Sequence, residues 1–166
     1  STPSASAGSV EQLVEEVQGA RLTYLDESAL SDLVAAVKSL DERNVAGDIF
    51  ELGCALGGSA IVLARSRGAA RRTVRFYDVF GLIPPPTEQD GPDVQQRYAE
   101  IVQGRSHGIG SDTYYGYQDD LMAVVSNNLC RFGVEMNDGI ELIKGLFDET
   151  LWPKGPIALA HIDCDW

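Results

Sequence analysis

Three glycines follow a short apolar segment with an acid near its end, and this arrangement indicates a site for a nucleotide-like ligand. Residues 48–52 are followed by Gly53, Gly57 and Gly58 and then by an apolar run. Glycine adopts positive φ angles and lets backbone N–H groups approach a ligand, and a helix starting after the turn adds a partial positive charge. The spacing is not Gly-x-Gly-x-x-Gly and no Lys-Ser/Thr pair follows, so a phosphate-binding P-loop is not the first expectation.

A further acid stands where a ribose-binding residue is expected. Asp78 ends the β-rich stretch 73–78, about 20 residues after Gly58, and an acid at this distance sits at the tip of the second strand and accepts the ribose hydroxyls. The alternative is a βαβ unit in which Asp78 is a solvated acid at a strand end. The glycine turn and the acid together favour the ligand site.

Two more carboxylates, Asp163 and Asp165, follow the apolar run 157–162. Carboxylate oxygens are hard ligands suited to Mg²⁺ or Ca²⁺, and one such group could instead act as a base. Two acids are too few for a complete metal site, so a pair of solvated strand-end acids is the alternative.

These residues need a sheet that brings strand ends to one edge. Apolar or β-rich stretches predict parallel strands over 48–52, 73–78 and 140–144 and a buried one over 157–162. A doubly wound α/β sheet binds ligands at the carboxyl ends of such strands. The loop that starts at Gly145 is expected at the same edge.

Apolar periodicity predicts the helices that cover this sheet. They are expected over 10–17, 28–40, 59–66, 93–103 and 121–129, with Asp26 or Ser28 capping the second and Gly133 ending the last. The stretch 21–25 is expected to be a compact β-rich segment. Arg65, Arg67, Arg71 and Arg72 are expected to form a solvated helix end.

The segment 80–118 is too long for an ordinary connection. It opens with three consecutive prolines, which exclude a helix there. Long connections in compact domains are usually lids or binding loops. The tyrosines at 98, 114, 115 and 117 suit closure over a polar ligand, although local packing explains them about equally well.

Length and net charge limit the domain organisation and the partners of the protein. The 166 residues suit one domain: a tail expected to be disordered over 1–9, N-terminal helices within 10–46, and an α/β domain over 47–166 with 80–118 as lid or acceptor loop. A net charge of −12 argues against nucleic acid and anionic membranes as partners. No membrane span or signal peptide is predicted, and three cysteines without metal-site spacing suggest reduced thiols in a cytoplasm.

With these motifs assembled, the chain resembles the macrocin O-methyltransferase family, S-adenosylmethionine-dependent enzymes of the class I fold that modify sugars in antibiotic biosynthesis. The resemblance covers about 21–166. The motifs are RLTYL at 21–25, GDIFELGCALGGS at 47–59, YDVFG at 77–81, YYGY at 114–117 and HIDCDW at 161–166.

The resemblance implies roles for individual residues. The methionine part of the cofactor would be held by Glu51, Gly53, Cys54, Gly57, Gly58 and Ser59, with Thr23 nearby. Asp78 would bind the ribose, and Gly145, Leu146 and Phe147 would lie near adenine. Tyr24, Tyr114 and Tyr115 would contact a small-molecule hydroxyl acceptor. Asp163 would bind Mg²⁺, with Asp165 as a catalytic neighbour; His107 is a weak candidate base, and His161 is expected to be structural.

The chain also departs from the family pattern at its C-terminal end. Members of the family continue past the Asp-x-Asp-Trp motif to an Asp-Asp pair that completes the metal site, so the chain is expected to be truncated after its fourth strand and incomplete for catalysis. A homo-oligomer is possible. Two alternatives stay open: a nucleotide-dependent oxidoreductase on the same fold, and a non-catalytic binding module.

Overall fold

The computed structural model describes residues 9–68 and 71–166. The tail expected over 1–9 lies outside the described residues except for Ser9. Ser9 is the N-cap of the first helix, and its hydroxyl accepts a hydrogen bond from the backbone N–H of Gln12 at 3.2 Å. The helix therefore begins at the point where the expected tail ends.

Four parallel strands form the sheet, as the sequence predicts. They are β1 (Asp48–Leu52), β2 (Val74–Asp78), β3 (Ile140–Lys144) and β4 (Ile157–Ile162), in the order β3-β2-β1-β4. β1 and β2 lie in the centre of the sheet, with β4 beside β1 and β3 beside β2. Because all the strands are parallel, their four carboxyl ends lie at one edge.

The expectation that β4 is buried is wrong. Most of its residues are partly or fully exposed, and Ile162 is 67% exposed. Within the described chain β4 pairs with β1 alone and lies at the edge of the sheet, so its outer side has no packing layer. Apolar run length predicted the strand correctly but could not place it within the sheet.

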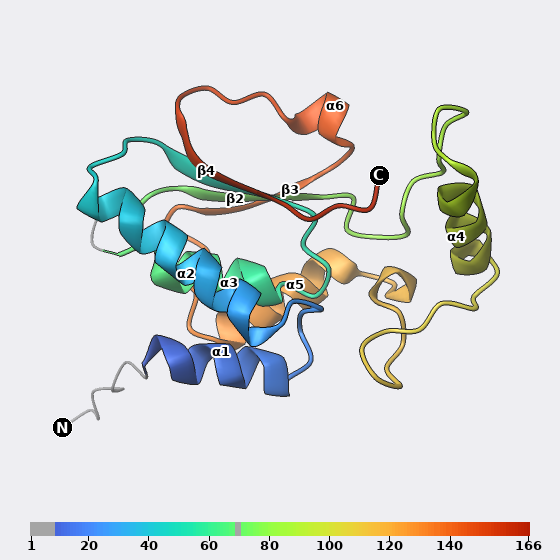
Figure 1. Cartoon of the computed structure of the whole chain (residues 1–166), viewed down its shortest axis with the longest axis horizontal. Coiled ribbons are helices and arrows are strands. Elements are labelled where there is room, and N and C mark those ends of the chain that lie inside the picture. Colours follow the sequence, from blue (N-terminus) through green and yellow to red (C-terminus); the bar gives the residue numbers. More distant parts are fainter. Residues whose placement is uncertain (1–8, 69–70) are drawn as a thin grey trace.

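Four helices cover one face of the sheet (Figure 1). They are α1 (Val10–Gly19), α2 (Glu27–Glu42), α3 (Gly58–Ser66) and α5 (Leu121–Arg131). The periodic apolar residues of these helices pack with the inner face of the sheet in one core, which includes Leu30, Ile61, Phe76 and Leu129. Asp26 caps α2 by accepting from the backbone N–H of Ala29 at 2.8 Å. No described helix is both long and apolar enough to span a bilayer.

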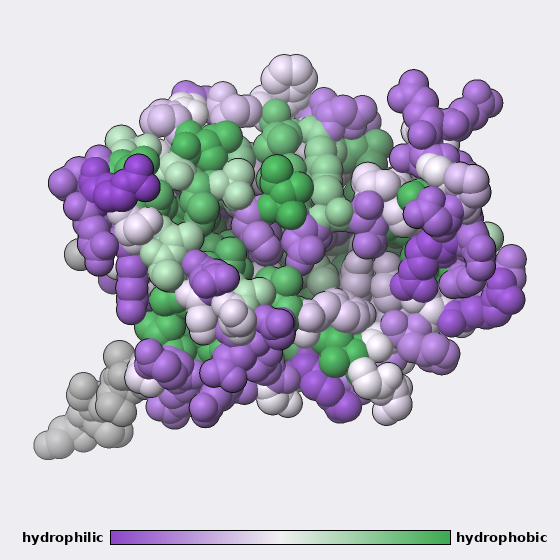
Figure 2. Space-filling model, in the orientation of Figure 1, coloured by the Kyte–Doolittle hydropathy of each residue, from purple (hydrophilic) through white to green (hydrophobic). Residues whose placement is uncertain are grey.

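The opposite face of the sheet is covered differently. Here Phe50, Leu52 and Tyr77 pack with Phe147 and Leu151 of a short helix and the loop after it, α6 (Phe147–Thr150). α6 has no signal in the sequence, because four residues are too few to show a helical period. Figure 2 shows apolar side chains gathered over the sheet in the upper middle of the view.

One local expectation is wrong and another holds only in part. The stretch 21–25 is an irregular turn rather than a β segment, since Arg21 has a φ of 55° and the Leu22 carbonyl accepts from the Gly58 N–H. The arginine cluster is a solvated helix end only in part, because Arg65 and Arg71 are exposed. Arg67 instead pairs with Asp138 at 2.8 Å and Arg72 with Asp41 at 3.0 Å, and both of these side chains are about nine-tenths buried.

The segment 80–118 stands beside the carboxyl edge of the sheet (Figure 1). It contains α4 (Pro92–Val102), close to the predicted helix, and the single turn η1 (Tyr115–Tyr117). The Tyr117 hydroxyl donates to the Ile101 carbonyl at 2.6 Å, which ties the tyrosine run to the end of α4. The aromatic residues thus order an otherwise irregular segment.

Candidate active site

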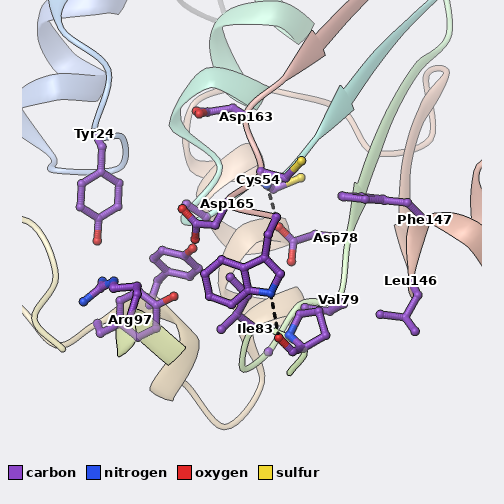
Figure 3. A pocket seen from close by; sticks show the side chains of 18 of the residues that line it. Tyr24, Cys54, Asp78, Val79, Ile83, Arg97, Leu146, Phe147, Asp163 and Asp165 are labelled. Atoms are coloured by element: carbon purple, nitrogen blue, oxygen red, sulfur yellow. Dashed lines mark hydrogen bonds between the residues drawn. The ribbon is translucent and has the colours of Figure 1, made fainter. Parts of the chain in front are cut away.

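A cleft of about 690 Å³ lies at the carboxyl edge of the sheet (Figure 3). Residues from the turn after β1, the ends of β2 and β4, the loop after β3, the 22–24 turn and the 80–118 segment line it. Of the residues that the sequence singles out, the cleft wall contains Thr23, Tyr24, Gly53, Cys54, Ser59, Asp78, His107, Tyr114, Tyr115, Gly145, Leu146, Phe147, Asp163 and Asp165. It does not contain Glu51, Gly57 or Gly58 among the residues that line it.

The glycines after β1 are required by close packing. Gly53 has a φ of 91°, and a Cβ there would lie 2.3 Å from the backbone oxygen of Asp163. A Cβ at Gly58 would lie 2.6 Å from the Leu22 carbonyl oxygen, and Gly57 faces Val125 of α5. Gly57 and Gly58 therefore bring α3, α5 and the 22–24 turn together, and only Gly53 reaches the cleft.

Asp78 joins β2 to the glycine turn. Its carboxylate accepts from the backbone N–H groups of Cys54 at 2.7 Å and Phe80 at 2.8 Å, and only 9% of the residue is exposed. Burial raises the pKa of Asp78, while the backbone N–H donors oppose that rise. A carboxylate has about four lone-pair positions, so two remain for hydroxyl donors of a ligand.

Glu51 lies behind the cleft wall, where it pairs with His161. The side chain of Glu51 is fully buried, and one of its oxygens lies 3.0 Å from Nδ1 of His161 on the neighbouring strand. Burial raises the pKa of Glu51, and the hydrogen bond with Glu51 raises the pKa of His161. The structure thus places His161 in a structural contact, and it brings Glu51 into the same contact.

One end of the cleft is lined by apolar side chains next to Asp78. Figure 3 shows Val79, Leu146 and Phe147 on the same side as Asp78. The N–H of Gly145 donates to the Asp78 carbonyl at 3.0 Å, which holds the loop after β3 against the end of β2. This end suits a flat aromatic group next to a carboxylate.

The other end is aromatic. Tyr24 packs edge-on against Tyr115 with ring centroids 6.2 Å apart, and Tyr114 and Tyr115 are 4.5 Å apart. The hydroxyl of Tyr114 is buried and has no hydrogen-bond partner among the described residues. Burial raises the pKa values of all three phenols, so they are neutral at physiological pH.

Asp163 and Asp165 reach the cleft between these two ends (Figure 3). The backbone N–H of Asp163 donates to the Leu52 carbonyl at 2.9 Å, so Asp163 extends the β1–β4 pairing beside Gly53. In the described part of the chain, no group of three or more His, Cys, Asp or Glu side chains is arranged to hold a metal ion. The two acids alone are therefore not a complete cation site.

The comparison with protein families decides the identity of this arrangement. Residues 15–166 match the family described as "Macrocin-O-methyltransferase (TylF)". The chain belongs to the macrocin O-methyltransferase family. It is accordingly an O-methyltransferase, the family implies S-adenosylmethionine as cofactor, and the oxidoreductase alternative is not supported.

Solved structures of O-methyltransferases share the fold. The structure titled "Structure of the O-methyltransferase NovP" superposes with a TM-score of 0.72 at 18% identity, over 93% of this chain and 71% of that one. "Crystal Structure of CalS11, Calicheamicin Methyltransferase" gives 0.56 at 15% identity, over 98% and 74%. These superpositions show a common fold. No curated protein sequence matches the chain.

Several residues of this O-methyltransferase line the cleft without having been nominated from sequence. Arg97 of α4, Ile83 and Trp166 are examples, and the Trp166 indole N–H donates to the Pro84 carbonyl at 3.2 Å. Arg97 lies in a predicted helix, but nothing in its spacing connects it to the strand ends. Only the path of the 80–118 segment in space brings it there.

Proposed function

We propose that this O-methyltransferase transfers a methyl group to a hydroxyl of a sugar or similar polyol natural product and depends on Mg²⁺. The main support is a single cleft with two chemically different ends and two carboxylates between them. The calicheamicin methyltransferase title and the family description both refer to natural products.

The sheet side of the cleft has the groups that S-adenosylmethionine needs. Asp78 would accept the ribose hydroxyls, and Gly145, Leu146 and Phe147 would contact adenine. Thr23, Gly53, Cys54 and Ser59 would surround the methionine part, with Glu51 supporting the turn from behind. When bound, the cofactor supplies an electrophilic methyl group on a sulfonium.

The tyrosine end suits a hydroxylated acceptor. Tyr24, Tyr114 and Tyr115 offer flat rings with polar tips, on which a sugar ring can pack. The unpaired hydroxyl of Tyr114 is a buried polar group that a ligand hydroxyl would satisfy. Asp165 would orient the reacting hydroxyl or accept its proton, because it lies on the cleft wall beside this end.

Asp163 would be one ligand of Mg²⁺, a cation that lowers the pKa of a bound hydroxyl and aligns it for attack. Since the described residues do not bring a complete ligand set together, the other ligands would be the acceptor and groups outside these residues.

Calorimetry tests the cofactor site, and a methyl-transfer assay tests the role of the cation. The chain should bind S-adenosylhomocysteine and not NAD, and failure to bind S-adenosylhomocysteine would contradict the assignment of the sheet side. For the cation, Asp163→Ala should abolish the Mg²⁺-dependent part of methyl transfer. Transfer that is unaffected by EDTA and by Asp163→Ala would rule out the proposed metal role while leaving the cofactor site intact.

A further inference from the structure

Arg97 is an unusual residue in the cleft wall. Among the described residues that line the cleft it is the one lysine or arginine, whereas five aspartates line it. It extends from α4, on the acceptor side, and Figure 3 shows it beside Tyr24 and across the cleft from Leu146 and Phe147. A cation placed at this end faces the acceptor rather than the adenosine part of the cofactor.

The guanidinium of Arg97 is held in position. Nη2 donates to the hydroxyl of Ser106 at 2.9 Å, and the guanidinium carbon lies 5.9 Å from the centre of the Tyr114 ring. Ser106 is itself buried, and its N–H donates to the Tyr117 hydroxyl at 3.2 Å. Hydrogen bonds and a ring face therefore fix the charge at the wall before any ligand binds.

Arg97 makes only a long, solvent-exposed ion pair among the described residues. Its nearest acid among the described residues is Glu100, one turn along α4, at 3.8 Å with both side chains well exposed. By contrast, Arg21, Arg67 and Arg72 have carboxylates at 3.1 Å or less. A guanidinium has five N–H donors, so several remain available to a ligand.

We propose that Arg97 determines acceptor specificity by binding an anionic group, a carboxylate or a phosphate, on the acceptor. This inference rests on the proposed function, since it takes the tyrosine end as the acceptor site. Guanidinium pairs with carboxylate and phosphate through two parallel hydrogen bonds, and the face of the Tyr114 ring and the Ser106 hydroxyl hold the guanidinium in place for such a pair.

The acidic residues of the cleft do not prevent this contact. Asp78 lies with the adenosine end and already accepts two backbone N–H groups. Asp165 acts on the same two rings as Arg97 with the opposite sign, since, besides burial, its charge raises the pKa values of Tyr24 and Tyr114 while the charge of Arg97 lowers them. An anion bound to Arg97 is thus restricted to the side of the acceptor site formed by α4 and Tyr24, which also sets the orientation of the reacting hydroxyl.

The test measures binding of three probes to the chain saturated with S-adenosylhomocysteine. The probes are methyl β-D-glucoside, methyl β-D-glucuronide and glucose 6-phosphate, observed by ligand NMR and calorimetry. We expect at least one anionic probe to bind about tenfold or more tightly than the neutral glycoside, equivalent to about 1.4 kcal/mol. The probe with the larger preference distinguishes a carboxylate from a phosphate.

Three variants assign the preference. Arg97→Gln should remove the preference for anionic probes. Arg97→Lys keeps the charge but loses the planar guanidinium, so it should retain part of the preference. Arg105→Gln is the matched control, because Arg105 is an exposed arginine of the same segment and is not among the cleft-lining residues. It should keep the full preference.

Three results would overturn the inference. The wild-type chain with S-adenosylhomocysteine bound could bind neutral and anionic probes equally, or bind no anionic probe at all. Alternatively, the preference for anionic probes could be undiminished in Arg97→Gln. Binding of S-adenosylhomocysteine itself shows whether a negative result contradicts the role of Arg97 or the proposed function. Normal binding with no anion preference contradicts the role of Arg97 alone, whereas absent binding contradicts the proposed function.

Discussion

The carboxylate of Asp78 accepts a hydrogen bond from the backbone N–H of Cys54 at 2.7 Å, across the ends of two neighbouring strands. The acid proposed to bind the ribose therefore also holds the glycine turn in place. Ribose binding and the conformation of the turn depend on the same side chain, and substitutions at Asp78 should affect both.

Asp78→Asn should weaken S-adenosylhomocysteine binding by at least about tenfold and reduce the free energy of unfolding by about 1–3 kcal/mol. An amide has one acceptor oxygen, so it cannot serve both the Cys54 and Phe80 N–H groups and a ribose hydroxyl as well. Calorimetry and urea denaturation measure the two effects. Asp119→Asn, at an exposed acid that is not among the cleft-lining residues, is the matched control and should change neither.

The raised pKa of Asp78 gives a pH dependence with a defined sign. Because burial raises the pKa above its ordinary value of 3.8, the folded protein holds this proton more tightly than the unfolded chain does. The stabilising contribution is complete below that value and is lost as pH rises through the raised pKa. The free energy of unfolding of the wild type minus that of Asp78→Asn should thus fall from about pH 4 upward. A difference that increases with pH would contradict the direction of the shift.

Much of the fold was predictable because it depends on local patterns. Helical periodicity and capping gave α2 and α5 nearly to the residue, and the β-rich stretches gave four strands. The distance from the glycine turn placed Asp78 correctly at the carboxyl edge, and the apolar run before Asp163 placed that acid at the same edge. These features follow from chain geometry within one βα unit or one strand.

What could not be predicted depends on contacts between distant segments. The burial of β4 depends on its place in the sheet, and the environment of Arg67 depends on Asp138, 71 residues away. Glu51 has the sequence position of a ligand-binding acid, yet one of its two carboxylate oxygens contacts His161 on the adjacent strand. No spacing rule connects such pairs in advance.

The contributions of Glu51 and His161 to the free energy of unfolding should be coupled. His161→Leu leaves the fully buried Glu51 carboxylate without its imidazole partner, which should cost about 3 kcal/mol. In a Glu51→Gln background no charge is left unpaired, so the same substitution should cost at least about 1 kcal/mol less. Urea denaturation of the four proteins at pH 7 gives the coupling energy. A coupling near zero would show that the two side chains contribute independently.

Gly53→Ala should disturb the closest approach between the turn after β1 and the end of β4. A Cβ at Gly53 would lie 2.3 Å from the Asp163 backbone oxygen, and the φ of 91° is unfavourable for alanine. We expect a loss of more than about 2 kcal/mol in the free energy of unfolding, together with weaker S-adenosylhomocysteine binding.

The control for this substitution is Gly19→Ala at the end of α1, where a Cβ meets nothing within 4 Å. Because Gly19 is helical and exposed, alanine there should leave stability unchanged or raise it by up to about 1 kcal/mol. Thermal or urea denaturation of both variants measures the contrast. If both variants unfold alike, the two strand ends do not approach closely in solution, and Asp163 would then not be held beside the cofactor turn.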